Sequence, residues 1–103
     1  MREIVLDTET TGFEPAEGHR IIEIAAIELV NLLPTGRFFH TLLDPERDVP
    51  AEATRIHGFT AADLSGQPRF AEKAEALLAF LGDSPIVAHN AEFDFRHLDA
   101  ELA

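Results

Sequence analysis

Cysteine, tryptophan and tyrosine are all missing from this sequence of 103 residues. Without cysteine there can be no disulfide bond and no thiolate metal site. Apolar runs long enough to cross a membrane are missing too, so we expect no membrane association. The first residues lead directly into a strand-like pattern without the layout of a signal peptide, which favours a cytoplasmic protein.

Basic residues are scarce, because eight Lys and Arg stand against 19 Asp and Glu, and the formal net charge is −11. Such a protein binds the phosphates of nucleic acids poorly on its own. A nuclease is not excluded, because divalent cations held by carboxylates supply positive charge at the site itself. The hydrophobic content of 46% is typical of a globular protein, and the length allows one small domain.

Hydrophobic periodicity predicts an α/β fold. We expect strands over residues 3–9, 20–31, 37–43 and 85–88, the last one short and buried, although a helix remains open for 20–31. We expect a loop over 10–19, a turn over 31–36 at Pro34 and Gly36, and helices over 50–57, 60–63, 69–81 and 91–102. The helical crossover favours a mixed sheet, with three antiparallel strands plus a parallel one and helices packed on it.

The last expected helix carries Ala91, Phe95, Leu98 and Leu102 at helical spacing, which predicts that this face packs on the core. Asp94 lies three residues after Ala91 and four before Leu98, so its carboxylate is expected on the core side. A buried carboxylate needs a cation or strong hydrogen-bond donors. The spacing fits equally well an acid that complements the dipole at the helix start.

Asp7 and Glu9 lie two residues apart in the first expected strand. Side chains at positions i and i+2 of a strand share one face, with Cα atoms about 6.5–7 Å apart. Two carboxylates this close repel each other unless a cation lies between them, and oxygen ligands suit Mg²⁺ or Mn²⁺. On spacing alone, a solvated strand end explains the pair at least as well.

Three short segments, taken together and in this order, resemble the DEDD superfamily of exonucleases. Residues 7–12 (DTETTG) resemble its first exonuclease motif, residues 89–94 (HNAEFD) its second, and residues 56–60 (IHGFT) its internal His-Gly segment. The resemblance extends over essentially all 103 residues and is closest to the epsilon, or proofreading, subunits of bacterial DNA polymerase III. Further similar pairs and stretches are residues 21–24, 30–31, 35–36 and 39–40.

The resemblance implies a ribonuclease H-like fold and 3′–5′ exonuclease activity that depends on two divalent cations, Mg²⁺ or Mn²⁺. The expected substrate is a single-stranded or frayed DNA 3′ end, and the expected partner is the catalytic subunit of a DNA polymerase. By their positions in the motifs, the expected metal ligands are Asp7, Glu9 and Asp94. The residues expected to meet the terminal nucleotide, besides Asp7 and Glu9, are Thr10, Thr11, Glu52 and His57.

One part of the family pattern is missing. The third motif, H-x₄-D, supplies a general base and a fourth carboxylate, and it follows the second motif after a further strand and helix. Only nine residues follow Asp94, and His97-Leu98-Asp99 has the wrong spacing and place. The sequence therefore predicts, over residues 1–103, an exonuclease domain that is truncated before this motif and lacks the C-terminal part of the fold.

The missing motif has a chemical consequence. Two divalent ions bring a charge of +4, and three ionised carboxylates supply only −3, so the second ion should bind poorly. Loss of a general base commonly lowers the rate roughly 10²–10⁴-fold. We therefore expect these residues alone to be inactive or weakly active.

Two alternatives remain open at this point. One is a relative that trims RNA ends, similar to ribonuclease T or oligoribonuclease. The other is a non-catalytic module that binds one metal ion or docks on a polymerase subunit.

Overall fold

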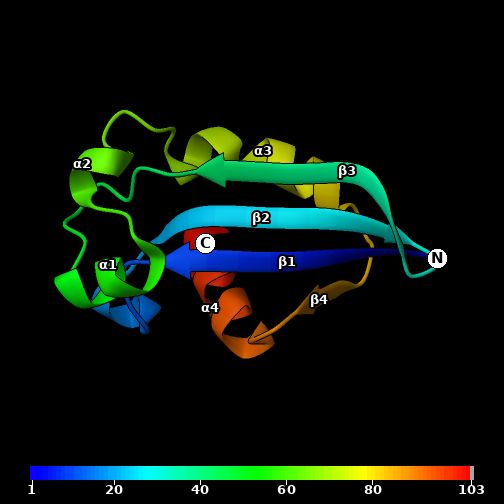
Figure 1. The fold of residues 1–103 in the computed structure, drawn as a ribbon, viewed down its shortest axis with the longest axis horizontal. Helices are drawn as coiled ribbons and strands as arrows, with labels where there is room; N and C mark the ends of the chain where they lie inside the picture. Colours follow the sequence, from blue (N-terminus) through cyan, green and yellow to red (C-terminus); the bar gives the residue numbers. More distant parts are fainter. Residues whose placement is uncertain (103) are drawn as a thin grey trace.

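A computed structural model describes residues 1–102 and contains one mixed sheet with helices (Figure 1). The strands are β1 (Arg2–Thr10), β2 (Ile21–Val30), β3 (Leu33–Leu42) and β4 (Ile86–Ala88). The helices are α1 (Ala51–His57), α2 (Ala61–Leu64), α3 (Phe70–Leu81), α4 (Ala91–Leu102) and the short 3₁₀ helix η1 (Pro15–Glu17). The strand order is β3-β2-β1-β4, with β1 to β3 antiparallel and β4 parallel to β1, which confirms the expected topology.

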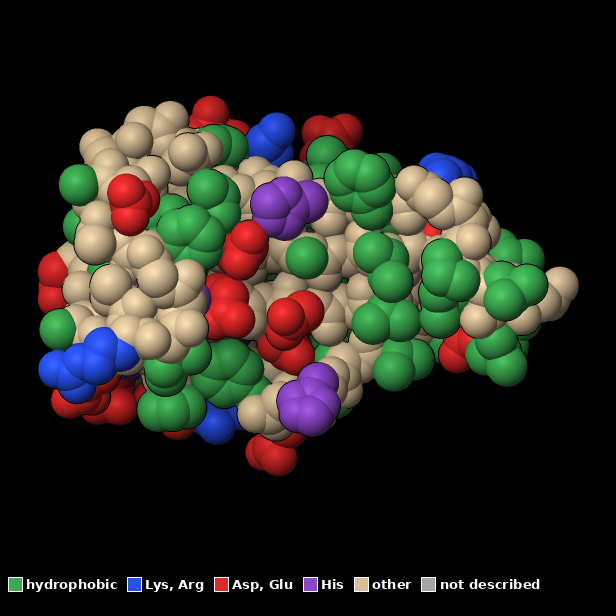
Figure 2. All heavy atoms as spheres, in the orientation of Figure 1, with side chains coloured by type: hydrophobic (Ala, Val, Ile, Leu, Met, Phe, Trp, Pro, Cys, Tyr) green, Lys and Arg blue, Asp and Glu red, His purple; other side chains and the backbone are tan. Residues whose placement is uncertain are grey.

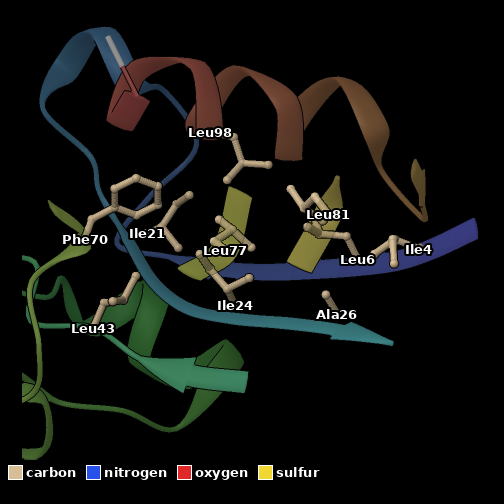
Figure 3. Close-up of a cluster of buried hydrophobic side chains, with 10 residues drawn as sticks. All are labelled: Ile4, Leu6, Ile21, Ile24, Ala26, Leu43, Phe70, Leu77, Leu81 and Leu98. Carbon is tan, nitrogen blue, oxygen red and sulfur yellow. The ribbon is translucent and has the colours of Figure 1, made fainter. Parts of the chain in front are cut away.

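The two long helices, α3 and α4, lie on one face of the sheet and bury its core. Strand β1 turns Ile4 and Leu6 toward them, because alternate side chains of a strand point to one face. Figure 3 shows Leu77 and Leu81 of α3 and Leu98 of α4 pointing at these strand residues. Neither these helices nor any other within residues 1–102 has the length and apolar character needed to cross a membrane.

The opposite face of the sheet is bare in the described part of the chain, as the front of the sheet in Figure 1 shows. An apolar row crosses this face, because Val87, Val5, Ile27 and Phe38 are paired in register across all four strands. Figure 2 shows hydrophobic side chains over the half of the strands that lies away from α1. Acidic side chains lie over the ends of β1 and β2 nearer to α1. The carboxylates of β1 thus share a face with exposed apolar side chains.

The turn between β2 and β3 is shorter and earlier than expected. Asn31 and Leu32 form it, with φ of 51° and 68°, as in the two-residue turns of β-hairpins that need positive φ at both positions. Pro34 and Gly36, which were expected to form the turn, lie within β3. An edge strand tolerates Pro34, because its missing N–H costs no bond on the open side.

Two expectations about burial are wrong. Strand β4 is not buried, because it forms the sheet edge and exposes 49% of Val87 on the bare face. Helix α4 does not bury the whole apolar face, since Phe95 and Leu102 are exposed and the buried residues are Asp94, His97 and Leu98. The helix is rotated toward polar partners on β1 and on the loop after it, which hydrophobic spacing cannot reveal.

Leu77 is 1% exposed at the centre of the core, whereas its neighbour Leu78 is 50% exposed on the same helix. We predict that Leu77→Ala lowers the free energy of unfolding by about 2–5 kcal/mol, because it leaves a cavity. Leu78→Ala is the matched control and should change it by less than about 0.5 kcal/mol, as for most surface positions. Urea denaturation followed by circular dichroism measures both, and equal losses would contradict the assigned core.

Candidate active site

Strand β1 carries two of the expected metal ligands on the bare face of the sheet. Asp7 is exposed and Glu9 is half-buried, and both alternate with residues that face the helices. The residue paired with Glu9 on β2 is Glu23, so a third acid lies directly across the strands. Side chains in such pairs come within about 5 Å of each other, and like charges there repel. This end of the sheet is therefore strongly acidic, as Figure 2 shows.

Helix α4 brings the third expected ligand to β1. Asp94 is 3% exposed, and its Oδ1 accepts a hydrogen bond from the Thr8 hydroxyl group. Thr8 lies between Asp7 and Glu9 in sequence, with its own side chain on the helix side of the strand. The bond therefore fixes Asp94 against the helix-facing side of β1, at the residue between the two expected ligands of that strand.

The three carboxylates influence one another's ionisation. Burial raises the pKa of Asp94; the Thr8 hydrogen bond opposes this rise and the charge of Asp7 adds to it. Burial also raises the pKa of Glu9, and the charges of Asp7, Glu23 and Asp94 raise it further. Such shifts are those of acids that lack a compensating cation.

No Lys or Arg side chain forms an ion pair with Asp7, Glu9 or Asp94 within residues 1–102. The ion pairs of that part of the chain use other acids, such as Glu28, Glu101 and Glu14. The donor set therefore suits a hard divalent cation such as Mg²⁺ or Mn²⁺. In the same residues no three Asp, Glu or His side chains are already arranged to hold an ion. An ion shared by all three carboxylates would require the accessible side chains of Asp7 and Glu9 to turn toward Asp94.

A cavity of about 280 Å³ opens beside the acidic end of β1. It brings together the residues expected to meet a nucleotide, and its lining includes Glu9, Thr10, Thr11, Glu52 and His57. Asp7 and Asp94 are not part of the lining. The residues of the first motif thus meet those of α1 at one hollow, although their roles there stay predictions.

His57 lines this cavity with its imidazole ring. Its Nδ1 accepts a hydrogen bond from the Phe59 backbone N–H at 3.1 Å, which places the ring proton on Nε2. Nε2 is buried and has no hydrogen-bond partner among residues 1–102. Burial lowers the pKa of His57, and the Thr10 backbone and the charge of Glu23 oppose this.

The cavity also has walls that the sequence analysis missed. Phe13 and Phe93 line it, with ring centroids 6.2 Å apart in an edge-to-face arrangement. His19 lines it too, and packs so tightly on Gly12 that an added Cβ would lie 2.5 Å from the imidazole ring. Phe13 follows the first motif directly and Phe93 lies within the second, so their position beside the motifs was the available signal.

Solved structures of exonucleases have a similar fold. Exonuclease X in complex with 5′ overhanging duplex DNA superposes with a TM-score of 0.74 at 28% identity, over 91% of this chain and 52% of that one. Escherichia coli exonuclease I in complex with a dT13 oligonucleotide gives a TM-score of 0.81 at 21% identity, over 93% of this chain and 22% of that one. The second likeness supports the fold alone.

Comparison with curated proteins gives nearer relatives. The DNA polymerase III subunit epsilon of Rickettsia conorii is 52% identical over 103 residues, which are 100% of this chain and 45% of that protein. The subunit of the same name from Escherichia coli K12 is 44% identical over 106 residues, 99% of this chain and 44% of that protein. The chain thus spans less than half of the length of these relatives.

The family assignment rests on a match over nearly the whole chain. The family model described as Exonuclease (RNase_T) matches residues 4–103, a range that contains the acidic strand, the cavity and the helix of Asp94. The expectation from the two motifs is thereby confirmed at the level of the family. This chain belongs to the exonuclease family.

Proposed function

We propose that this chain forms the front part of a metal-dependent 3′–5′ exonuclease that removes nucleotides from DNA 3′ ends during replication proofreading. One observation carries the proposal: Asp94 of the second motif is hydrogen-bonded to Thr8, the residue between Asp7 and Glu9 of the first motif, and a cavity lined by Glu9 lies beside this end of β1. The relatives named DNA polymerase III subunit epsilon support the proofreading role.

We assign the metal site to Asp7, Glu9 and Asp94. Bound Mg²⁺ or Mn²⁺ would supply the positive charge that activates a water molecule and stabilises the leaving 3′ oxygen. The Thr8 hydroxyl group binds Oδ1 of Asp94, and we assign the other oxygen of Asp94 to the ion. Mutual repulsion of the carboxylates makes ion binding favourable, because an ion relieves it.

The terminal nucleotide fits the cavity beside Glu9. Its volume of about 280 Å³ is close to the lower end for small-ligand pockets, about 300 Å³. Phe13 and Phe93 offer apolar surface to a base, and the Nε2–H of His57 offers a donor to a sugar or phosphate oxygen. The backbone at Thr10 and Thr11 and the carboxylate of Glu52 complete the contacts that we propose.

The general base and a fourth carboxylate would come from residues outside these 103, packed on the bare face of the sheet. The three carboxylates supply −3 against the +4 of two ions, so a further acid would balance the site. The apolar row from Val87 to Phe38 offers a surface for such a segment. Because the net charge is −11, we propose that a polymerase catalytic subunit holds the single-stranded or frayed DNA 3′ end.

We predict that Asp7→Ala or Asp94→Ala in the full-length protein abolishes metal-dependent hydrolysis, because either change removes a ligand of the proposed ions. Release of nucleotides from the 3′ end of a labelled DNA strand measures this loss. Asp99→Ala is the control, since Asp99 is exposed on the same helix and should keep the wild-type rate. Wild-type rates in Asp7→Ala or Asp94→Ala would refute the assigned ligands.

Asp94→Asn should make stability depend less on pH. A carboxyl whose folded pKa is raised favours the folded state below its ordinary pKa, and this advantage is lost as the pH rises through the folded value. Without an ion, the variant should therefore melt above the wild type at neutral pH, and the gap should close in acid.

Thermal melts between pH 3 and pH 8, each with and without Mn²⁺, test this expectation. Mn²⁺ should raise the melting temperature of the wild type and have little effect on Asp94→Asn. An equal rise in both proteins would show that the ion binds elsewhere. A gap that persists at pH 3 would show that the charge of Asp94 is not its cause.

Matched DNA and RNA oligonucleotides separate the proposed activity from RNA-end trimming. We predict that the full-length protein shortens the DNA strand from its 3′ end at the higher rate. Gel analysis of both strands at equal concentration provides the measurement. Preferential shortening of RNA would assign the protein to the other class, and shortening of neither would favour a non-catalytic module.

A further inference from the structure

The last turn of α4 is fastened to the start of β2 by a buried carboxylate. The Glu101 side chain is 4% exposed, and Arg20 Nε lies 2.9 Å and 3.0 Å from its two oxygens. Arg20 Nη2 lies 2.5 Å from Oε1, and the Ile21 backbone N–H donates to Oε2 at 3.1 Å. Both carboxylate oxygens of Glu101 are therefore used in joining residues about 80 positions apart in sequence.

Glu101 is buried while the Arg20 side chain remains 38% exposed, so the loss of Arg20 would leave a buried carboxylate without its main partner, which is costly. Glu101 follows Asp94 by seven residues, which is two helical turns, so both side chains lie on the same side of α4. Glu101, which binds the start of β2, and Asp94, which we assign to the metal, are thus both carried by α4.

From Arg20 the contacts lead directly to the cavity wall. The Thr11 backbone N–H donates to the Arg20 carbonyl oxygen at 2.9 Å, and the Arg20 backbone N–H donates to Thr11 Oγ1 at 3.0 Å. Thr11 is buried, lines the cavity and follows Glu9 and Thr10 in the first motif. A displacement of Arg20 would therefore move the wall at Thr11.

Two other contacts join α4 to the loop between β1 and β2, and they are weaker candidates for holding the cavity wall in place. Arg96 binds Glu14 with both partners partly exposed, and such pairs contribute little. His97 is buried, and its Nε2 lies 3.1 Å from the Gly12 carbonyl oxygen, but this is one contact against the several of Glu101. The pair of Glu101 and Arg20 thus makes more hydrogen bonds than either of these contacts in joining α4 to the segment that leads to Thr11.

We propose that Glu101 is a positioning residue of the exonuclease site. Through Arg20 it holds the cavity wall at Thr10 and Thr11 at a fixed place relative to the helix that carries Asp94. The bound nucleotide and the bound ion are thereby kept at the separation that hydrolysis needs. The inference rests on the function proposed above.

The test measures nucleotide and ion binding separately, in the intact protein. Thymidine monophosphate and Mn²⁺ are the probes, each titrated calorimetrically at 10 °C. Glu101→Gln should weaken nucleotide binding about tenfold, because a neutral amide cannot accept the paired hydrogen bonds of the Arg20 guanidinium group with both of its polar atoms. The Mn²⁺ affinity of the same variant should stay within about twofold of wild type. Arg20→Lys keeps the charge but loses the guanidinium group, and should weaken nucleotide binding by a smaller factor.

Glu14→Gln is the matched control, because it removes the exposed pair at the same interface and should leave both affinities unchanged. A wild-type protein that binds neither probe would count against the proposed function itself. If the wild type binds both and Glu101→Gln binds the nucleotide equally well, the positioning role is wrong. If Glu101→Gln fails to fold, folded Arg20→Lys provides the test instead. A nucleotide affinity equal to that of the wild type in Arg20→Lys would then show that the positioning role of Glu101 is wrong.

Discussion

The site depends above all on the hydrogen bond from Thr8 to Asp94, which joins the first strand to the last helix across 86 positions of sequence. Thr8 faces the helices, while its neighbours Asp7 and Glu9 face the other side. The bond therefore holds the carboxylate of the second motif at the strand segment that carries those of the first. Its cost is a buried carboxylate with a raised pKa, which an ion would relieve.

Much of this arrangement could be predicted from the sequence, because the elements involved follow local rules. The alternation around Asp7 and Glu9 is seen in the structure, and α2 and α3 lie within one residue of the expected helices 60–63 and 69–81. The helical crossover before β4 predicted that this strand is parallel to the sheet, and β4 does pair in parallel with β1. These features need only the chemistry of neighbouring residues.

The rest could not be predicted, because it depends on partners distant in sequence. Helical spacing counts apolar residues, so it placed Phe95 and Leu102 in the core and gave no role to His97. In the structure His97 lies between the carbonyl oxygens of Phe93 and Gly12, and Glu101 binds Arg20. The part of the cavity wall formed by Phe13, His19 and Phe93 was missed, since it forms where the loop after β1 meets α4.

The central claim is that the first strand and the last helix form one ion site, and the position of bound Mn²⁺ tests it most directly. Paramagnetic Mn²⁺ broadens NMR signals close to it. We predict that substoichiometric Mn²⁺ first broadens the backbone amide signals of Asp7, Thr8, Glu9 and Asp94 together. Broadening that begins at the exposed acids of α3, Glu72 and Glu75, or that reaches β1 without α4, would contradict the claim.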